Sequence, residues 1–187
     1  MRRRSLVPKT AICFLLFCCC WLNTVIHAHH EEDDHSHSAE KITIGKSTYT
    51  YVKSILSVYE EVYENICDRQ LNHVPELSQL LIDYATKGTE TETKNPGRHM
   101  MQGILEGAKR LQRADGLLNT QIAFASISDA ISPLFKSWPN LLKKNKIELF
   151  QCKVHRHSWL QPQDAPPVCP YAHRVTSQCT SITDDYQ

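Results

Sequence analysis

Cysteine and histidine occur at short spacings in the C-terminal part of the chain. A Cys-x2-His pair with a further histidine is followed by a Cys-x3-His pair and then by a last cysteine. Thiolate sulfur and imidazole nitrogen at such spacings can bind one metal ion tetrahedrally, and this donor set suits copper or zinc. The candidate metal ligands are therefore Cys152, His155, His157, Cys169, His173 and Cys179.

The same cysteines allow a different role, because two thiols that lie close together in an oxidising compartment often form a disulfide. The plausible pairs are Cys152 with Cys179 and Cys169 with Cys179, which leaves Cys67 for a bridge to the tail or as a buried thiol. Oxidation removes the thiolate ligands, so a disulfide and a thiolate metal site can alternate but cannot coexist on the same sulfur atoms.

A second set of candidate ligands lies near the N-terminus. Residues 29–37 contain four histidines and four acidic residues but no apolar side chain, so we expect a solvated, flexible segment. Imidazole and carboxylate groups in such a segment can bind a divalent metal weakly; the alternative is a plain soluble linker. The weak accessory ligands are His29, His30, His35 and His37.

The first residues are typical of a secretory signal peptide. Three arginines at positions 2–4 precede an apolar run at 11–22, which is too short for a comfortable membrane span of about 20 residues. Cleavage after Ala28 would deliver the rest to the periplasm or outside the cell, with no membrane span remaining. The alternative is an uncleaved N-terminal anchor.

The charge distribution follows the same division. The formal net charge of the whole chain is +1, but residues 1–28 hold four of the 21 basic residues and none of the 20 acidic ones. The remainder therefore has a net charge of −3, without the positive surface that nucleic-acid binding requires. Nucleophile elbows, phosphate-binding loops and HExxH helices are absent from the sequence, so we expect a protein that is not an enzyme.

Apolar residues recur every three or four positions in four segments between residues 48 and 137, which predicts an antiparallel bundle of about four helices. Gly88 is expected to end the second helix before a polar loop at 89–96, and Pro133 to kink or stop the fourth. Met100 and Met101 are assigned to the core rather than to a soft-metal site. A strand is predicted at 147–154.

The fold class is thus mainly α, with a short strand-containing, Cys/His-rich tail. The predicted organisation has four parts. They are a signal peptide (1–28), a His/acid-rich linker (29–47), a helical bundle (48–137) and a tail packed on the bundle (138–187).

Several of these residues resemble a family of bacterial exported domains of unknown function. The resemblance rests on the segment 124–131, on Trp159-Leu160, on Pro170-Tyr171 and on the closing Cys179. Members of that family have a helical region followed by Cys-Pro-Met, Trp-Leu, Asn-Pro-Tyr and a last cysteine. They also occur appended to adaptor proteins of heavy-metal efflux systems. The resemblance implies a periplasmic role in handling copper or a related metal, with an efflux or envelope protein as partner.

The chain departs from the family pattern at positions that matter for metal choice. Lys153-Val154 replaces the Pro-Met, Cys169 replaces the Asn, His173 replaces a Gly and Thr176 replaces a Met. Imidazole is a harder ligand than thioether, so these exchanges shift the expected metal toward zinc or copper(II).

Only two cysteines match the family, Cys152 and Cys179. The resemblance therefore also allows a structural disulfide between them. In that case the protein would be a disulfide-stapled helical interaction domain of the cell envelope with no metal function.

Overall fold

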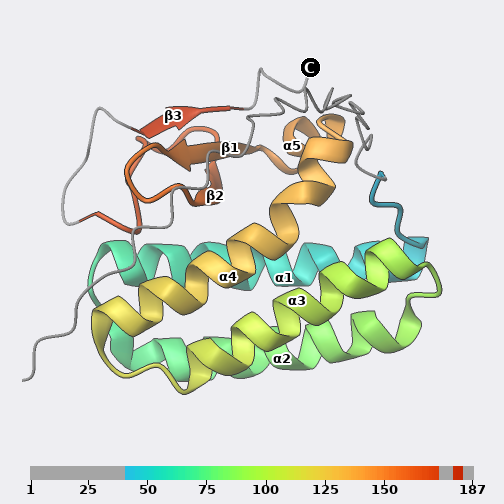
Figure 1. Cartoon of the computed structure of the whole chain (residues 1–187), viewed down its shortest axis with the longest axis horizontal. Helices are drawn as coiled ribbons and strands as arrows, with labels where there is room; N and C mark the ends of the chain where they lie inside the picture. The colour runs from blue at the N-terminus through green and yellow to red at the C-terminus, as the bar shows by residue number, and fades with distance from the viewer. Residues whose placement is uncertain (1–40, 173–178, 183–187) are drawn as a thin grey trace, which may run out of the picture. The chain divides into compact units, whose positions relative to one another are not determined.

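The computed structural model describes residues 41–172 and 179–182, and these residues are mainly helical, as the sequence predicted. Figure 1 shows the long helices packed together, with the small sheet on one side of them. The helices are α1 (Lys46–Cys67), α2 (Val74–Thr91), α3 (Asn95–Gln112) and α4 (Gly116–Ser137), with a short 3₁₀ helix η1 (Leu71–His73) and a short helix α5 (Asn140–Asn145). Consecutive long helices pack against one another.

One helix end differs from the prediction, and a stop considered inside another helix does not occur. Gly88 does not end α2, which continues to Thr91, because this glycine is a packing position. A Cβ atom at Gly88 would overlap the terminal methyl group of Met101, so its absence lets α2 and α3 approach closely. Pro133 lies inside α4 without stopping it, and the helix continues to Ser137.

The apolar faces of the helices form the core. Met100 and Met101 are 4% and 0% exposed, which confirms their assignment to it. Each of the four long helices also carries exposed positions on its outer face. In the described part of the chain, no helix is both long enough and apolar enough to cross a membrane.

The tail forms a three-stranded antiparallel sheet in the order β2-β1-β3. Its strands are β1 (Ile147–Cys152), β2 (Ser158–Pro162) and β3 (Cys179–Ser181). The first falls within the predicted strand at 147–154, whereas the other two were not predicted. In the register of β1 and β3, Cys152 lies opposite Cys179.

Buried hydroxyl groups join the sheet to the helices. The Tyr59 hydroxyl oxygen of α1 lies 2.6 Å from the Ser128 Oγ of α4 and accepts a hydrogen bond from the Leu160 N–H of β2 at 3.2 Å. The Tyr171 hydroxyl donates to the Ser158 carbonyl oxygen at 3.0 Å and also lies 3.3 Å from the Ser128 Oγ. Because β2 is an edge strand, these contacts satisfy groups that no further strand can pair.

This arrangement predicts the effect of removing one hydroxyl. Tyr59→Phe leaves the Leu160 N–H buried without an acceptor, so the free energy of unfolding should fall by about 1–3 kcal/mol. Denaturant unfolding followed by circular dichroism measures this loss. The matched control is Tyr51→Phe at a partly buried position on the same helix, which should change stability by less than about 0.5 kcal/mol. Equal stability of the two variants would contradict the role assigned to Tyr59.

Candidate metal centre

A tight turn between β1 and β2 places His155 beside Cys152. Cys152 N donates to His157 O at 3.0 Å, and Arg156 N donates to Cys152 O at 2.7 Å. Arg156 completes the turn with a φ of 59°, in the left-handed region that tight turns often use. The Cys152 Sγ consequently lies 3.1 Å from the His155 Nδ1 and accepts a hydrogen bond from His155 N at 3.5 Å.

Two helices hold the segment that carries Cys169. Tyr63 of α1 donates to Val168 O at 2.8 Å, and Gln121 of α4 donates to Pro170 O at 2.7 Å. Both neighbours of Cys169 are thus anchored, and Cys169 itself is only 2% exposed. Its position is therefore determined by the packing of the tail on the bundle.

The turn and the anchored segment bring three of the predicted ligands together. One ligand atom from each of Cys152, His155 and Cys169 lies within 4.8 Å of the others. Bond lengths of about 2.3 Å to sulfur and about 2.0–2.1 Å to nitrogen place two ligands of a tetrahedral zinc ion about 3.5–3.8 Å apart. Shifts of about one ångström would satisfy that geometry, so the two thiols and the imidazole fit a zinc or copper ion.

The environment of Cys152 favours its thiolate form. Burial raises the pKa of this thiol, but hydrogen bonds from the His155 backbone and side chain, from the Val154 backbone and from the Cys169 side chain outweigh it and lower the pKa to about 7. Cys67 shows the opposite balance, because burial raises the pKa of its thiol to about 11. Of these two thiols, Cys152 is therefore the one that ionises near neutral pH.

The imidazole side of the group faces a surface groove of about 470 Å³. His155 is exposed there, whereas Cys152 and Cys169 are buried. The exposed apolar side chains of Leu118 and Ile122, from the first half of α4, also line this groove. A metal ion held by the three residues would therefore be sheltered on its sulfur side and accessible on its imidazole side.

His157 lies in the same groove but does not belong to the three-residue group. Its Nδ1 atom lies 3.0 Å from the Asp129 Oδ2 of α4. The His155 and His157 rings flank the Tyr171 ring, with centroid distances of 6.2 Å and 5.4 Å. The structure thus places His157 next to the candidate centre, paired with a carboxylate.

Several predicted ligands lie outside the described residues. They are His173 and the four histidines of the accessory set, and the predicted signal peptide lies outside them too. The backbone of Cys179 lies on β3, opposite Cys152. Cys67, Cys152 and Cys169 are thiols in the structure.

Sequence reasoning did not identify Gln121 or Asp129 as neighbours of the candidate centre. Gln121 anchors the Cys169 segment and Asp129 orients His157. The only signal in the sequence was that Asp129 falls within the segment 124–131 that carries the family resemblance. Both contacts join residues far apart in the chain, so local spacing could not reveal them.

Comparison with known proteins adds no further assignment. The chain matches no family model, no curated protein and no solved structure. The function is therefore inferred from the geometry of Cys152, His155 and Cys169 and from the residues around them.

The lowered pKa of Cys152 can be tested in reduced, metal-free protein. The ultraviolet absorbance of thiolate should rise in a step near pH 7, with the thiol form below this pH and the thiolate above it. His155→Ala removes a hydrogen bond to the sulfur and should move the step to higher pH, while Cys67→Ser should leave it unchanged. A step that persists near pH 7 in Cys152→Ser would assign it to another group and contradict the account.

Proposed function

We propose that the protein is an exported, non-enzymatic metal-binding protein of the kind that serves heavy-metal efflux or resistance. Cys152, His155 and Cys169 bind a zinc or copper ion as its cargo. The observation that carries the proposal is the convergence of these three side chains, contributed by two separate segments, within 4.8 Å. Two sulfur atoms and one imidazole nitrogen form a donor set that magnesium or calcium would not select.

The exposure of the group supports handling of a metal ion rather than permanent storage. Structural zinc sites are usually closed by four protein ligands, whereas three ligands leave one position for exchange. His155 is exposed at the groove, so an incoming or departing ion would pass on that side. In this proposal the fourth position holds an exchangeable ligand, either water or one of the other predicted ligands His173 and Cys179, and the histidines of residues 29–37 collect ions weakly.

A second candidate function is favoured by the register of the sheet. Cys152 and Cys179 are paired across β1 and β3, and directly opposed residues of antiparallel strands have Cα atoms about 4.5–5.5 Å apart. Disulfides usually join Cα atoms 4.4–6.8 Å apart, so this pair is within reach. Oxidised in this way, the protein would be a stapled interaction domain without a thiolate metal site.

Metal titration of the reduced protein distinguishes the two functions. Cobalt(II) serves as a coloured substitute for zinc, and its thiolate absorption bands report binding by cysteine. Replacing one ligand, in Cys152→Ser, Cys169→Ser or His155→Ala, should weaken binding by more than about 100-fold, because even changes beyond the ligands cost 10–100-fold. Binding should release protons, since thiols must ionise to become ligands.

Two controls make the titration decisive. Cys67→Ser removes a cysteine whose raised pKa keeps it protonated and should leave cobalt binding unchanged. A variant lacking residues 29–37 should lose only weak, thiolate-independent binding. If wild-type protein shows no thiolate bands when reduced, or if protein isolated from its native compartment has Cys152 joined to Cys179, the metal function is wrong and the stapled domain is favoured.

A further inference from the structure

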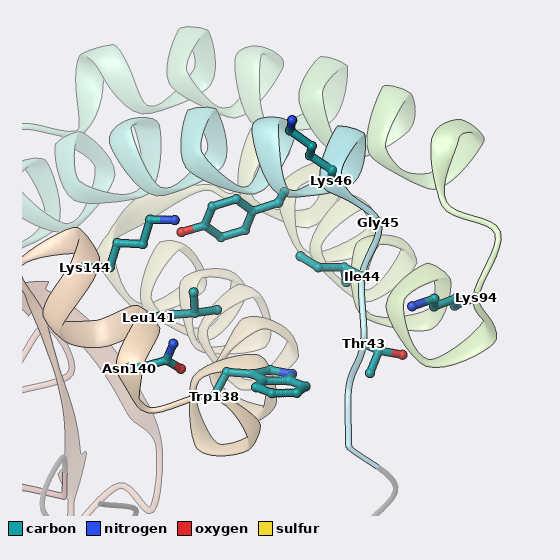
Figure 2. A pocket seen from close by; sticks show the side chains of 10 residues that line it. Thr43, Ile44, Gly45, Lys46, Lys94, Trp138, Asn140, Leu141 and Lys144 are labelled. Carbon is teal, nitrogen blue, oxygen red and sulfur yellow. The ribbon is translucent and has the colours of Figure 1, made fainter.

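A separate pocket of about 520 Å³ lies between the segment before α1, the start of α1 and helix α5 (Figure 2). None of its lining residues belongs to the candidate metal centre. Its volume falls within the range of about 300–1,000 Å³ that is typical of small-molecule sites. Its chemistry differs from that of the groove at His155, so it needs an explanation of its own.

The walls of this pocket are fixed by hydrogen bonds between distant parts of the chain. Ile42 N donates to the Ser137 Oγ at 3.2 Å, and the Trp138 Nε1 donates to Ile42 O at 2.6 Å. A few residues further on, Gly45 N donates to the Glu92 Oε2 at 2.8 Å. The segment that forms one wall is thus tied to the end of α4 and to the end of α2, which makes the pocket preformed.

The charged side chains that line the pocket are all positive. Lys46, Lys94 and Lys144 line it, and the described lining residues include no acidic side chain. Lys41 adds a fourth cation, with its Nζ 5.4 Å from the centre of the Trp138 ring. Within residues 41–172 and 179–182, none of these four lysines forms an ion pair.

The nearest carboxylate does not neutralise this charge from inside the pocket. Glu92 is 1% exposed, and its two oxygen atoms accept hydrogen bonds from Gly45 N and Lys94 N. Burial raises the pKa of this carboxyl, but the hydrogen bonds outweigh it and lower the pKa overall. The Glu92 carboxylate is therefore hydrogen-bonded to the backbone of the pocket wall. The lysine side chains remain available to an anion.

The rest of the lining is aromatic and aliphatic. Trp138 is 37% exposed, although most tryptophans are largely buried, and Tyr49 lies beneath Lys144, whose Nζ is 5.2 Å from the tyrosine ring centre. Ile44 and Leu141 complete the apolar surface. Figure 2 shows Trp138, Leu141 and Ile44 around the same opening. The face of an aromatic ligand could pack against these side chains.

We propose that this pocket binds a small organic anion, namely a planar aromatic body that carries one acidic group such as carboxylate or sulfonate. The aromatic body packs against Trp138 and Leu141, and the lysines that line the pocket, Lys46, Lys94 and Lys144, attract the acidic group. One pocket of this size, on a chain with a net charge of −3 after residue 28, suits a single small anion rather than a long polyanion. The site does not depend on metal binding.

The test compares two probes of nearly the same shape on the full chain. Anilinonaphthalene sulfonate carries the acidic group, and N-phenylnaphthylamine is its neutral counterpart. The anionic probe should bind at least about tenfold more tightly, because the lysines around the pocket attract its acidic group. Energy transfer to the bound probe reports occupancy of this pocket through the part of the transfer that is lost in Trp138→Phe, because this variant removes the tryptophan donor that lines the site.

Charge variants identify the site. Lys94→Gln with Lys144→Gln should reduce the affinity for the anionic probe to that for the neutral one and leave the neutral probe unaffected. The matched control, Lys87→Gln with Lys109→Gln, removes the same charge from positions outside the pocket and should change neither affinity. Equal affinity for both probes in the wild type, or the same loss in the control variant, would overturn the proposal. Because the readout needs no metal, failure of this test leaves the metal-binding function untouched.

Discussion

The structure depends on a small set of buried hydroxyl groups whose hydrogen bonds join the sheet to the helices. Ser128 is fully buried at the centre of this set, between the hydroxyl groups of Tyr59 and Tyr171. Without these contacts the edge strand β2 would carry buried backbone groups with no partner. Fastening β2 also fixes the turn that holds His155, and Tyr171 fixes the segment that follows Cys169. The geometry of the candidate centre is therefore a consequence of how the tail sits on the bundle.

The candidate centre combines a buried position with a lowered thiol pKa, two features that usually oppose each other. Burial disfavours a thiolate, yet the pKa of Cys152 is lowered because several donors converge on its sulfur. The same convergence keeps Cys169 close, so the sulfur atoms could bind a metal together or be lost to oxidation. The cross-strand position of Cys179 adds a competing partner for Cys152. Reduction and metal supply would then decide which state the protein adopts.

The sequence predicted the parts of this arrangement that are local. The three- and four-residue periodicity predicted the helices because each buries one face, and the Cys-x2-His spacing predicted the contact between Cys152 and His155 because one tight turn makes it. Cys169 was also predicted as a ligand, although its position depends on hydrogen bonds from two helices that are distant in sequence. The disulfide, the signal peptide and the metal itself stay predictions.

What the sequence could not predict depends on tertiary packing. Gly88 has the appearance of a helix stop, yet it is needed where Met101 packs closely against α2. His157 has the spacing of a ligand, but Asp129 of α4 pairs with it. The strands β2 and β3 are short, and β2 owes part of its hydrogen bonding to Tyr59. The lysine pocket was not predicted either, because its walls come from three segments that are distant in sequence.

X-ray absorption at the zinc edge, on protein loaded with one equivalent of zinc, tests the central claim most directly. The account predicts a first shell with two sulfur atoms at about 2.3 Å and at least one nitrogen atom at about 2.0–2.1 Å. Removing residues 29–37 should leave that shell unchanged. A first shell of nitrogen and oxygen alone, lost with residues 29–37, would contradict a metal centre at Cys152, His155 and Cys169.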